Sequence, residues 1–459
     1  MIVSFAEAIS ALDARILGGG VPPQSLDITT DTRSVAPGQT FLALRGERFD
    51  GHAFVAQALA AGAACAVVAD ASVIPSDACG LLVADTLAAY MTLAALARGQ
   101  RHGTVIAITG STGKTTTKSF LRDLIARSGH DVQATPENEN NEIGVSKFLL
   151  GLAPGGDESV TIVEMGARHA GDIAPLAQIA RPHVGILTNI GEAHLEIMGS
   201  REAIAETKWG LFASGARAVI GLADPASRAR AGSLPQAPQW FGIDDEAVPE
   251  TEHAAILNGT HELVVHELGK VRRFPIDVRV PGDHNRANIA AAIAGAIAIG
   301  IDPAQLAPHV GALELPHGRY EKFVAGDLTI VFDAYNASMS GMLAALSAFA
   351  AERASRRIAV LGSMAELGPD AASMHELVGE AAAHSNLDAL FVGGAFADSI
   401  VRGARTNGFA SNAIHLYEDN AHAARLLREL ALPGDIVLLK GSRVYKMEQI
   451  AEAFGVSLR

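Results

Sequence analysis

Residues Thr104 to Lys118 hold the side chains whose types and spacing point most directly to chemistry. A short apolar run is followed by a loop with two glycines, which let backbone N–H groups approach phosphate oxygens. A helix after the loop would add the positive end of its dipole. Lys114 would reach the outer phosphates of a nucleotide, and Thr115 would ligate Mg²⁺. The predicted phosphate-binding residues are Gly110, Ser111, Thr112, Gly113, Lys114, Thr115 and Thr116.

This loop departs from the usual pattern G-x-x-x-x-G-K-[ST] at one position. Ile108 stands where the first glycine belongs, and the loop reads GSTGKTT. The alternative interpretation is a glycine turn before an ordinary helix. The strand-like run before the loop and the helix-like run after it favour the phosphate loop.

Two further polar side chains follow apolar runs typical of buried strands. Glu164 ends the run that begins at Val160, and His194 follows the run 184–190. In open α/β sheets the carboxyl ends of parallel strands form the ligand-binding edge, where the phosphate loop also lies. Either residue alone could be a cap or a surface group, but together they indicate magnesium ligands.

Other polar residues have two open interpretations. Asn285 and Asn288 are three apart at the start of an alanine-rich helix, so they share a face and could bind a base or cap the helix. The glycine turns with Asp31, Arg33 and Arg45 could bind a diphosphate or merely connect strands.

Alternating strand-like and helix-like runs predict the elements that position these residues. The predicted fold is α/β with three domains: a small α/β domain at 1–100, a central P-loop domain with a doubly wound parallel sheet at 101–314, and a Rossmann-like domain at 315–459. We expect a loop-rich insertion between Pro225 and Val280 in the central domain.

Composition excludes several classes of protein. The chain has 459 residues, a net charge of −14 and 49% hydrophobic residues. This balance fits a packed α/β protein and argues against nucleic acid or an anionic membrane as the main partner. The two cysteines suggest neither disulfides nor zinc, and the chain shows neither a secretory signal nor a membrane-spanning run, so we expect a cytoplasmic monomer.

Several motifs, in order along nearly the whole chain, resemble the Mur ligases, the ATP-dependent enzymes that form the amide bonds of the peptidoglycan stem peptide. The segments that carry the resemblance are Gly110 to Thr116, Asn138 to Gly144, Glu164 to Ala167, Asn189 to His194, Lys208, Gly282 to Asn288, His317 to Arg319 and Asp333 to Asn336.

Within this family, four segments of the chain are most similar to those of one member. The segments around Asp31, Asp333 to Ala337, Leu361 to Gly368 and Lys440 to Arg443 are similar to those of the member that joins D-alanyl-D-alanine to UDP-N-acetylmuramoyl-tripeptide. The Asp-Asn-Pro-Arg motif of the member that adds the third stem residue is absent. Ser338 replaces a common proline, and Val444 to Lys446 also depart from the family pattern.

The resemblance implies roles for individual residues around ATP and Mg²⁺. Lys114 would cradle the phosphates, Thr115 and Glu164 would hold one Mg²⁺, and His194 with Glu164 would hold a second. Lys208 would carry a carbamate and serve as a further metal ligand. Asn285 and Asn288 would approach the adenine, and Arg319 and Asp333 would reach the γ-phosphate region and the ribose when the third domain closes.

The resemblance also implies where the two substrates lie. Asn140 and Asn141 would contact the muramoyl-peptide side, Asn336 would contact the incoming dipeptide, and Asp31, Arg33 and Arg45 would contact the uridine diphosphate. His52 could equally be a turn residue. Two alternatives stay open: another ATP-dependent amide ligase of the same family, and a P-loop NTPase that uses hydrolysis as a switch.

Overall fold

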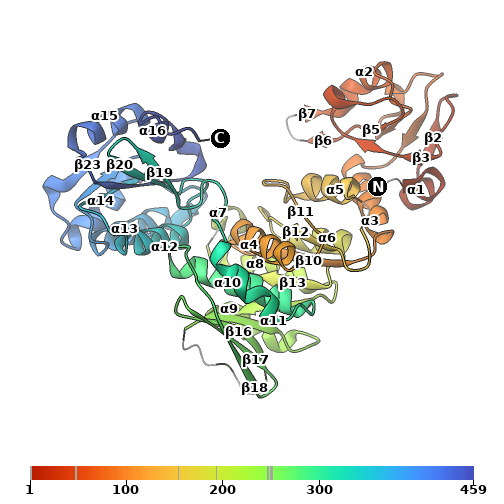
Figure 1. The fold of residues 1–459 in the computed structure, drawn as a ribbon. Helices are drawn as coiled ribbons and strands as arrows, with labels where there is room; N and C mark the ends of the chain where they lie inside the picture. Colours follow the sequence, from red (N-terminus) through yellow and green to blue (C-terminus); the bar gives the residue numbers. More distant parts are fainter. Residues whose placement is uncertain are drawn as a thin grey trace.

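The chain folds into three α/β domains, which Figure 1 shows as three lobes with the central domain between the other two. The computed structural model describes residues 3–46, 49–153, 155–192, 194–244, 248 and 252–458. The fold class predicted from the sequence, a central P-loop domain flanked by two smaller α/β domains, is confirmed.

The N-terminal domain is built on a five-stranded sheet with the order β2-β9-β8-β5-β4. Only β2 runs antiparallel to its neighbour. Helix α3 begins after Asp85, whose carboxylate accepts the N–H of Ala88 as an N-cap. The elements are β1 (Val3–Ser4), α1 (Phe5–Leu12), β2 (Arg15–Leu17), β3 (Ser25–Leu26), β4 (Ile28–Thr29), β5 (Thr40–Leu42), β6 (Arg45–Gly46), β7 (Phe49–Asp50), α2 (Val55–Ala60), β8 (Cys65–Val68), β9 (Gly80–Leu82) and α3 (Thr86–Gly99).

The central domain contains a nine-stranded sheet with the order β11-β12-β10-β13-β14-β15-β16-β17-β18. Its strands are parallel from β11 to β16, and β17 and β18 complete it as antiparallel strands. The strands are β10 (Thr104–Thr109), β11 (Val132–Ala134), β12 (Val160–Glu164), β13 (Val184–Leu187), β14 (Arg217–Gly221), β15 (Gln239–Ile243), β16 (His253–Asn258), β17 (Glu262–Glu267) and β18 (Lys270–Pro275). The helices are α4 (Lys114–Arg127), α5 (Glu142–Gly151), α6 (Ile173–Ala180), α7 (Leu195–Met198), α8 (Arg201–Trp209), α9 (Pro225–Arg230), α10 (Asp283–Ala298) and α11 (Pro303–Leu306).

Helices cover both faces of this sheet. Successive side chains of β10 point in opposite directions, so the strand contributes apolar side chains to a core on each face. Val105 and Ala107 join the core beneath α6, whereas Ile106 and Ile108 join the core beneath α4 and α10. Helix α3 packs against α5 and α6, so the N-terminal domain is anchored on one face of the central domain.

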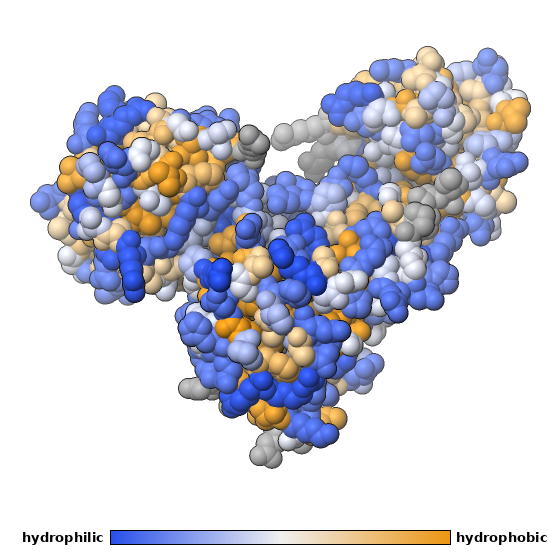
Figure 2. Space-filling view, viewed as in Figure 1, coloured by the Kyte–Doolittle hydropathy of each residue, from blue (hydrophilic) through white to orange (hydrophobic). Residues whose placement is uncertain are grey.

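The expectation of a loop-rich insertion at 225–280 was wrong. This segment forms α9 and the four strands β15 to β18, and α10 packs on β15 and β16. The apolar side chains of these strands share a core with α10, which begins at Asp283 directly after this segment. Leu268 and Val271, at the hairpin between β17 and β18, are 68% and 51% exposed, and Figure 2 shows orange surface at this tip.

The C-terminal domain contains a six-stranded sheet with the order β19-β20-β24-β21-β22-β23, parallel except for the pair β19–β20. Its elements are β19 (Glu321–Ala325), β20 (Leu328–Phe332), α12 (Met339–Ala350), β21 (Arg357–Leu361), α13 (Ala371–Ala383), β22 (Ala389–Val392), α14 (Ala397–Thr406), β23 (Ile414–Leu416), α15 (Asn420–Leu430), β24 (Ile436–Lys440) and α16 (Glu448–Glu452). Across the described part of the chain, no helix is both long and apolar enough to cross a membrane.

Candidate active site

The predicted phosphate loop lies between the end of β10 and the start of α4. Gly113 precedes α4 with a φ of 79°, and no side chain caps the helix. A Cβ at Gly113 would collide with the side-chain oxygen of Asn288 on α10. The first N–H groups of α4 are therefore left for a ligand, and a helix N-terminus of this kind binds anions.

The Lys114 side chain turns back over this loop. Its Nζ donates to the carbonyl oxygens of Gly110 at 2.8 Å and Ser111 at 3.4 Å. Burial lowers the pKa of Lys114, and the nearby carboxylate of Glu164 opposes that shift. The ammonium is thus held at the loop where phosphate oxygens would need a positive charge.

The residues after β13 brace the loop from the opposite side. The side chain of Asn189 accepts the Thr112 N–H at 3.1 Å and donates to the Thr112 hydroxyl at 2.9 Å. The Ser111 hydroxyl accepts the Gly191 N–H at 2.8 Å. These bonds fix the loop before any ligand binds, and sequence reasoning had assigned Asn189 no role. Its position at the end of a parallel strand beside β10 was the available signal.

Glu164 is the buried acid of the site, with 2% of its surface exposed. One carboxylate oxygen accepts from the Thr115 hydroxyl at 3.1 Å and from Asn140 at 2.9 Å. The other lies 2.9 Å from Nζ of Lys118. Burial favours the neutral acid, but Lys118 and then Lys114 outweigh it, so the pKa of Glu164 lies below its ordinary value. A carboxylate and a hydroxyl therefore face each other beside the phosphate loop.

His194 contacts the C-terminal domain. Its Nδ1 lies 2.5 Å from a carboxylate oxygen of Glu366, and Arg168 approaches the other oxygen of Glu366 at 3.4 Å. His194 has a φ of 62° and stands at the N-cap of α7. Sequence reasoning selected His194 but assigned no individual role to Glu366, which is 172 residues away in the chain.

Lys208 on α8 is 2% exposed. Within the described part of the chain, its Nζ has neither a hydrogen-bond acceptor nor a carboxylate partner. Burial, and then the charge of Lys114, lower its pKa well below the ordinary value. A lysine with a lowered pKa loses its proton more readily than an ordinary lysine, and the neutral amine that results is a nucleophile.

Asn285 and Asn288 lie in the first turns of α10, where Asn285 donates to the Pro281 carbonyl at 2.8 Å. Asn288 accepts from the Thr117 hydroxyl at 3.3 Å, which places its amide directly under the phosphate loop. Both residues are almost fully buried. The two asparagines therefore join α10 to the loop and the start of α4.

The C-terminal domain supplies a second set of polar groups. The guanidinium of Arg319 lies 4.1 Å from the ring centre of Tyr335, whose hydroxyl donates to Asn138 of the central domain. Asp333 pairs with Lys440 at 2.8 Å, and Asn336 accepts the N–H of Ala337. Arg319 and Asp333 thereby face the central domain in fixed positions.

A cleft of about 1350 Å³ lies between the central and C-terminal domains. The predicted site residues that line it are Ser111, Thr112, Gly113, Lys114, Thr115, Thr116, Asn140, Asn141, Glu164, His194, Asn285, Asn288, Arg319, Asp333 and Asn336. Gly110 and Lys208 do not line this cleft, nor do Asp31, Arg33 and Arg45 of the N-terminal domain.

Comparisons with known proteins agree with this arrangement. Models of the Mur ligase catalytic, middle and glutamate ligase domains match residues 27–96, 108–296 and 318–443. The UDP-N-acetylmuramoyl-tripeptide–D-alanyl-D-alanine ligase of Synechocystis sp. is 38% identical, with 91% of this chain and 89% of the relative covered. This chain belongs to the Mur ligase family.

Two solved Mur ligase structures share the whole architecture. MurF from Acinetobacter baumannii is 27% identical, with a TM-score of 0.86 and 99% of each chain covered. MurF ligase from Thermotoga maritima, solved in complex with ADP, is 30% identical, with a TM-score of 0.78 and 93% of this chain and 96% of that chain covered. The three-domain arrangement is therefore that of known family members.

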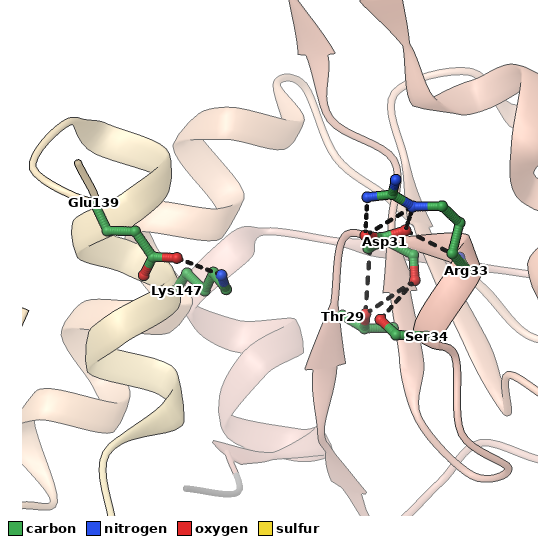
Figure 3. Close-up of polar contacts among 6 residues, drawn as sticks. All are labelled: Thr29, Asp31, Arg33, Ser34, Glu139 and Lys147. Atoms are coloured by element: carbon green, nitrogen blue, oxygen red, sulfur yellow. Dashed lines mark hydrogen bonds and ion pairs between the residues drawn. The ribbon is translucent and has the colours of Figure 1, made fainter. Parts of the chain in front are cut away.

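In this Mur ligase the site residues predicted in the N-terminal domain lie apart from the cleft. Asp31 pairs with Arg33 at 2.6 Å, and this bond, with a smaller contribution from Lys147, lowers the pKa of Asp31 to about 2. Figure 3 shows Lys147 and Glu139, around α5 of the central domain, on the side of that domain that faces this turn. Charged groups from both domains therefore border the space between them.

Arg45 and His52 share the acid Asp50, which pairs with Arg45 at 2.9 Å and with Nδ1 of His52 at 2.6 Å. His52 is buried, and its Nε2 accepts the N–H of Ala69 at 2.8 Å. Both ring nitrogens of His52 are thus used within the domain. His52 is a structural residue of the turn.

The residues at the site provide some of the ligands that a magnesium ion needs. Thr115 and Glu164 offer a hydroxyl and a carboxylate oxygen 3.1 Å apart, which are ligands that Mg²⁺ prefers. Among the described residues, no group of three or more His, Cys, Asp and Glu side chains could hold a metal ion. A second ion near His194 would need a further oxygen ligand, which an unmodified Lys208 does not provide.

Proposed function

We propose that this chain joins D-alanyl-D-alanine to the free carboxylate of UDP-N-acetylmuramoyl-tripeptide, with conversion of ATP to ADP and phosphate. The observation that carries the proposal is a cleft that the phosphate loop, Glu164 and the C-terminal residues Arg319 and Asp333 line together. Relatives from Synechocystis sp. and Bacillus subtilis, the latter 34% identical with 93% of this chain covered, bear the name of that ligase. We also propose that the enzyme is cytoplasmic and monomeric.

The first step makes a leaving group from a carboxylate oxygen. That oxygen attacks the γ-phosphorus, the bond from the γ-phosphorus to the β-γ bridging oxygen breaks, and ADP and an acyl phosphate result. Several anionic oxygens meet in this step, so the site must supply positive charge and alignment. Lys114 and the N–H groups at the start of α4 supply both, and Arg319 adds a second positive charge from the opposite wall.

The second step forms the amide bond. The dipeptide amine attacks the acyl carbon, a tetrahedral intermediate forms, and phosphate departs as the nitrogen loses its proton. An acyl phosphate hydrolyses if water reaches it, so the cleft must be closed during this step. The contacts of Tyr335 with Asn138 and of Glu366 with His194 hold the C-terminal domain against the central domain.

Magnesium fits this site at Thr115 and Glu164, where it would offset the negative charge of the β- and γ-phosphates. We infer that Lys208 reacts with carbon dioxide and so provides the oxygen ligand that a second ion near His194 would need. The neutral amine attacks the carbon of CO₂ and loses one proton, which leaves a carbamate with carboxylate-like oxygens. Burial of Lys208 without a carboxylate partner among the described residues supports this step.

The other predicted contacts remain part of the proposal. Asn288 and Asn285 approach the adenine, Asp333 the ribose and Asn336 the incoming dipeptide, since all four line the cleft. Asn140 donates to Glu164, and Asn141 caps α5 by accepting the Gly144 N–H. Both would contact the muramoyl-peptide substrate.

The N-terminal domain has a separate part in the proposal. Asp31, Arg33 and Arg45 would receive the uridine diphosphate. Arg33 is well exposed beside the central domain, and Arg45 is likewise accessible, so both guanidinium groups can reach a ligand placed between the two domains. The length of the nucleotide-linked peptide would then span from this turn to the phosphate loop.

A substrate panel tests the function. Phosphate release and product mass are measured with ATP, UDP-N-acetylmuramoyl-tripeptide and either D-alanyl-D-alanine or single amino acids. We expect phosphate release to require both the tripeptide and the dipeptide, and the product mass to increase by one dipeptide less water.

Two outcomes would contradict the proposal. Phosphate release without the dipeptide would favour an NTPase switch, and a product formed only from a single amino acid would favour another amide ligase. Lys114→Ala should abolish phosphate release, whereas Lys270→Ala, at an exposed position on β18, should leave it unchanged.

A further inference from the structure

The contact between His194 and Glu366 joins two domains at a histidine that faces the cleft. Nδ1 of His194 lies 2.5 Å from Oε2 of Glu366, and the two side chains are 31% and 35% exposed. A carboxylate oxygen only accepts hydrogen bonds, so the proton in this bond sits on Nδ1. In the tautomer with its proton on Nδ1, the lone pair lies on Nε2.

The backbone at both residues is strained. His194 has a φ of 62° and Glu366 a φ of 59°, a left-handed conformation that costs free energy for residues other than glycine. Such strain persists where the surroundings hold it and is concentrated at functional sites. Here it turns both side chains toward each other across the domain boundary.

Further contacts hold Glu366 in place. Its carbonyl oxygen accepts the N–H of Glu196 from α7 at 3.3 Å, and Arg168 lies 3.4 Å from its second carboxylate oxygen. Gly368 packs on Glu196, where a Cβ would lie 3.3 Å from the Glu196 Cα. The segment 366–368 is thus docked on the helix that His194 begins.

We propose that Glu366 is a positioning residue that sets the tautomer of His194 when the C-terminal domain docks, and so prepares Nε2 as a ligand for a divalent cation. The proposal rests on the proposed function. Metal-binding histidines commonly donate their other N–H to a carboxylate, which fixes the ring and raises the basicity of the ligand nitrogen. In this chain the carboxylate comes from the domain that closes over the nucleotide. Cation binding at His194 is therefore coupled to domain docking.

The first test reads the tautomer directly and needs neither substrate nor metal. The full-length protein is labelled with ¹⁵N-histidine, and the ring signal that disappears in His194→Gln is assigned to His194. We expect the wild-type ring to carry its proton on Nδ1. Glu366→Ala should move that proton to Nε2, whereas Glu366→Gln, which keeps an acceptor oxygen, should retain the wild-type tautomer.

The second test measures Mn²⁺ binding in the presence of ADP by electron paramagnetic resonance. We expect Glu366→Ala to weaken the affinity by about 10-fold or more and Glu366→Gln to weaken it less. The matched control is Glu376→Ala, because Glu376 pairs with Arg402 on the surface of the same domain, away from the cleft.

Two results would overturn the proposal: an unchanged tautomer in Glu366→Ala, or an altered tautomer with unchanged Mn²⁺ affinity. Melting temperatures show whether the variants fold, and if Glu366→Ala does not fold, a wild-type His194 ring that carries its proton on Nε2 also overturns it. Neither readout involves a peptide substrate, so failure here is distinguishable from failure of the proposed ligase activity.

Discussion

The Nζ atom of Lys118 lies 2.9 Å from a carboxylate oxygen of Glu164, and both side chains are more than nine-tenths buried. Lys208 is equally buried, but among the described residues no carboxylate pairs with it. The central domain therefore holds one buried lysine that is paired with a carboxylate, Lys118, and one that has no such partner among the described residues, Lys208. Their opposite surroundings give opposite predictions for stability.

Replacement of Lys118 should destabilise the protein. Lys118→Met leaves the Glu164 carboxylate buried without its main partner, and loss of one member of a buried pair costs about 3–5 kcal/mol. The free energy of unfolding is measured by urea denaturation at pH 7. Lys147→Met is the control, because Lys147 pairs with Glu139 at a more exposed position, where a pair contributes about 1 kcal/mol or less. Equal losses in the two variants would contradict this prediction.

The same pair predicts how wild-type stability depends on pH. The pKa of Glu164 is lower in the folded state than its ordinary value, so its contribution is present above the ordinary carboxyl pKa. That contribution is lost as the pH falls through the folded-state pKa. In Lys118→Met the loss should begin at a higher pH, which urea denaturation across an acid pH series measures.

Replacement of Lys208 should have the opposite effect on stability. Because its folded-state pKa lies well below the ordinary value, the unfolded chain binds more protons between these two pKa values, and stability rises with pH across that window. In CO₂-free buffer at pH 7, Lys208→Met should unfold with a free energy higher by about 1 kcal/mol or more. The difference from wild type should shrink as the pH approaches the ordinary lysine pKa. A less stable Lys208→Met would contradict this account of the site.

The carbamate at Lys208 has its own test. Labelled bicarbonate should give a ¹³C carbamate signal in the wild type that is absent from Lys208→Ala. Lys208→Ala should be inactive in amide formation, and short carboxylates such as formate or acetate should restore part of the activity by supplying the lost oxygens. An active Lys208→Ala without added carboxylate would show that no carbamate is needed.

Gly113→Ala should weaken nucleotide binding. A Cβ at this position meets Asn288, so the loop must shift away from α10 and its N–H groups lose their alignment. We expect ADP affinity, measured by calorimetry, to fall by about 10-fold or more, which corresponds to about 1.4 kcal/mol. Gly129→Ala is the control, since Gly129 follows α4 with a φ of 92° and a Cβ added there would meet no atom within 4 Å. An equal loss of affinity in the control would mean that backbone strain alone explains the effect.

Tyr335 should act through Arg319. Tyr335→Ala removes the ring 4.1 Å from the Arg319 guanidinium, an interaction of about 1–2 kcal/mol, so KM for ATP should rise by about 5- to 30-fold. Tyr335→Phe keeps the ring and loses only the contact with Asn138, so its KM should change less. Phe454→Ala disturbs a similar pair with Arg428, 5.2 Å away in the same domain, and should leave KM unchanged. Identical KM values for Tyr335→Ala and wild type would contradict the prediction.

The sequence by itself determined the local features of this protein. The run from Thr104 to Lys118 predicted the strand, the loop and the start of the helix, because glycine conformation and apolar burial depend on near neighbours. Glu164 was found because a buried strand ends there, and parallel strands end at one sheet edge. The segment 225–280 was misjudged because its strands are short and extend the sheet at β14, and local sequence patterns do not show that pairing.

Tertiary structure alone decided which polar groups meet. The pairs Lys118–Glu164 and His194–Glu366 span 46 and 172 residues, and no sequence period relates their members. Polar side chains are common on surfaces, so their types do not show which of them will be buried together. Only tertiary packing removes water from Glu164 and Lys208, and that desolvation shifts the pKa of each.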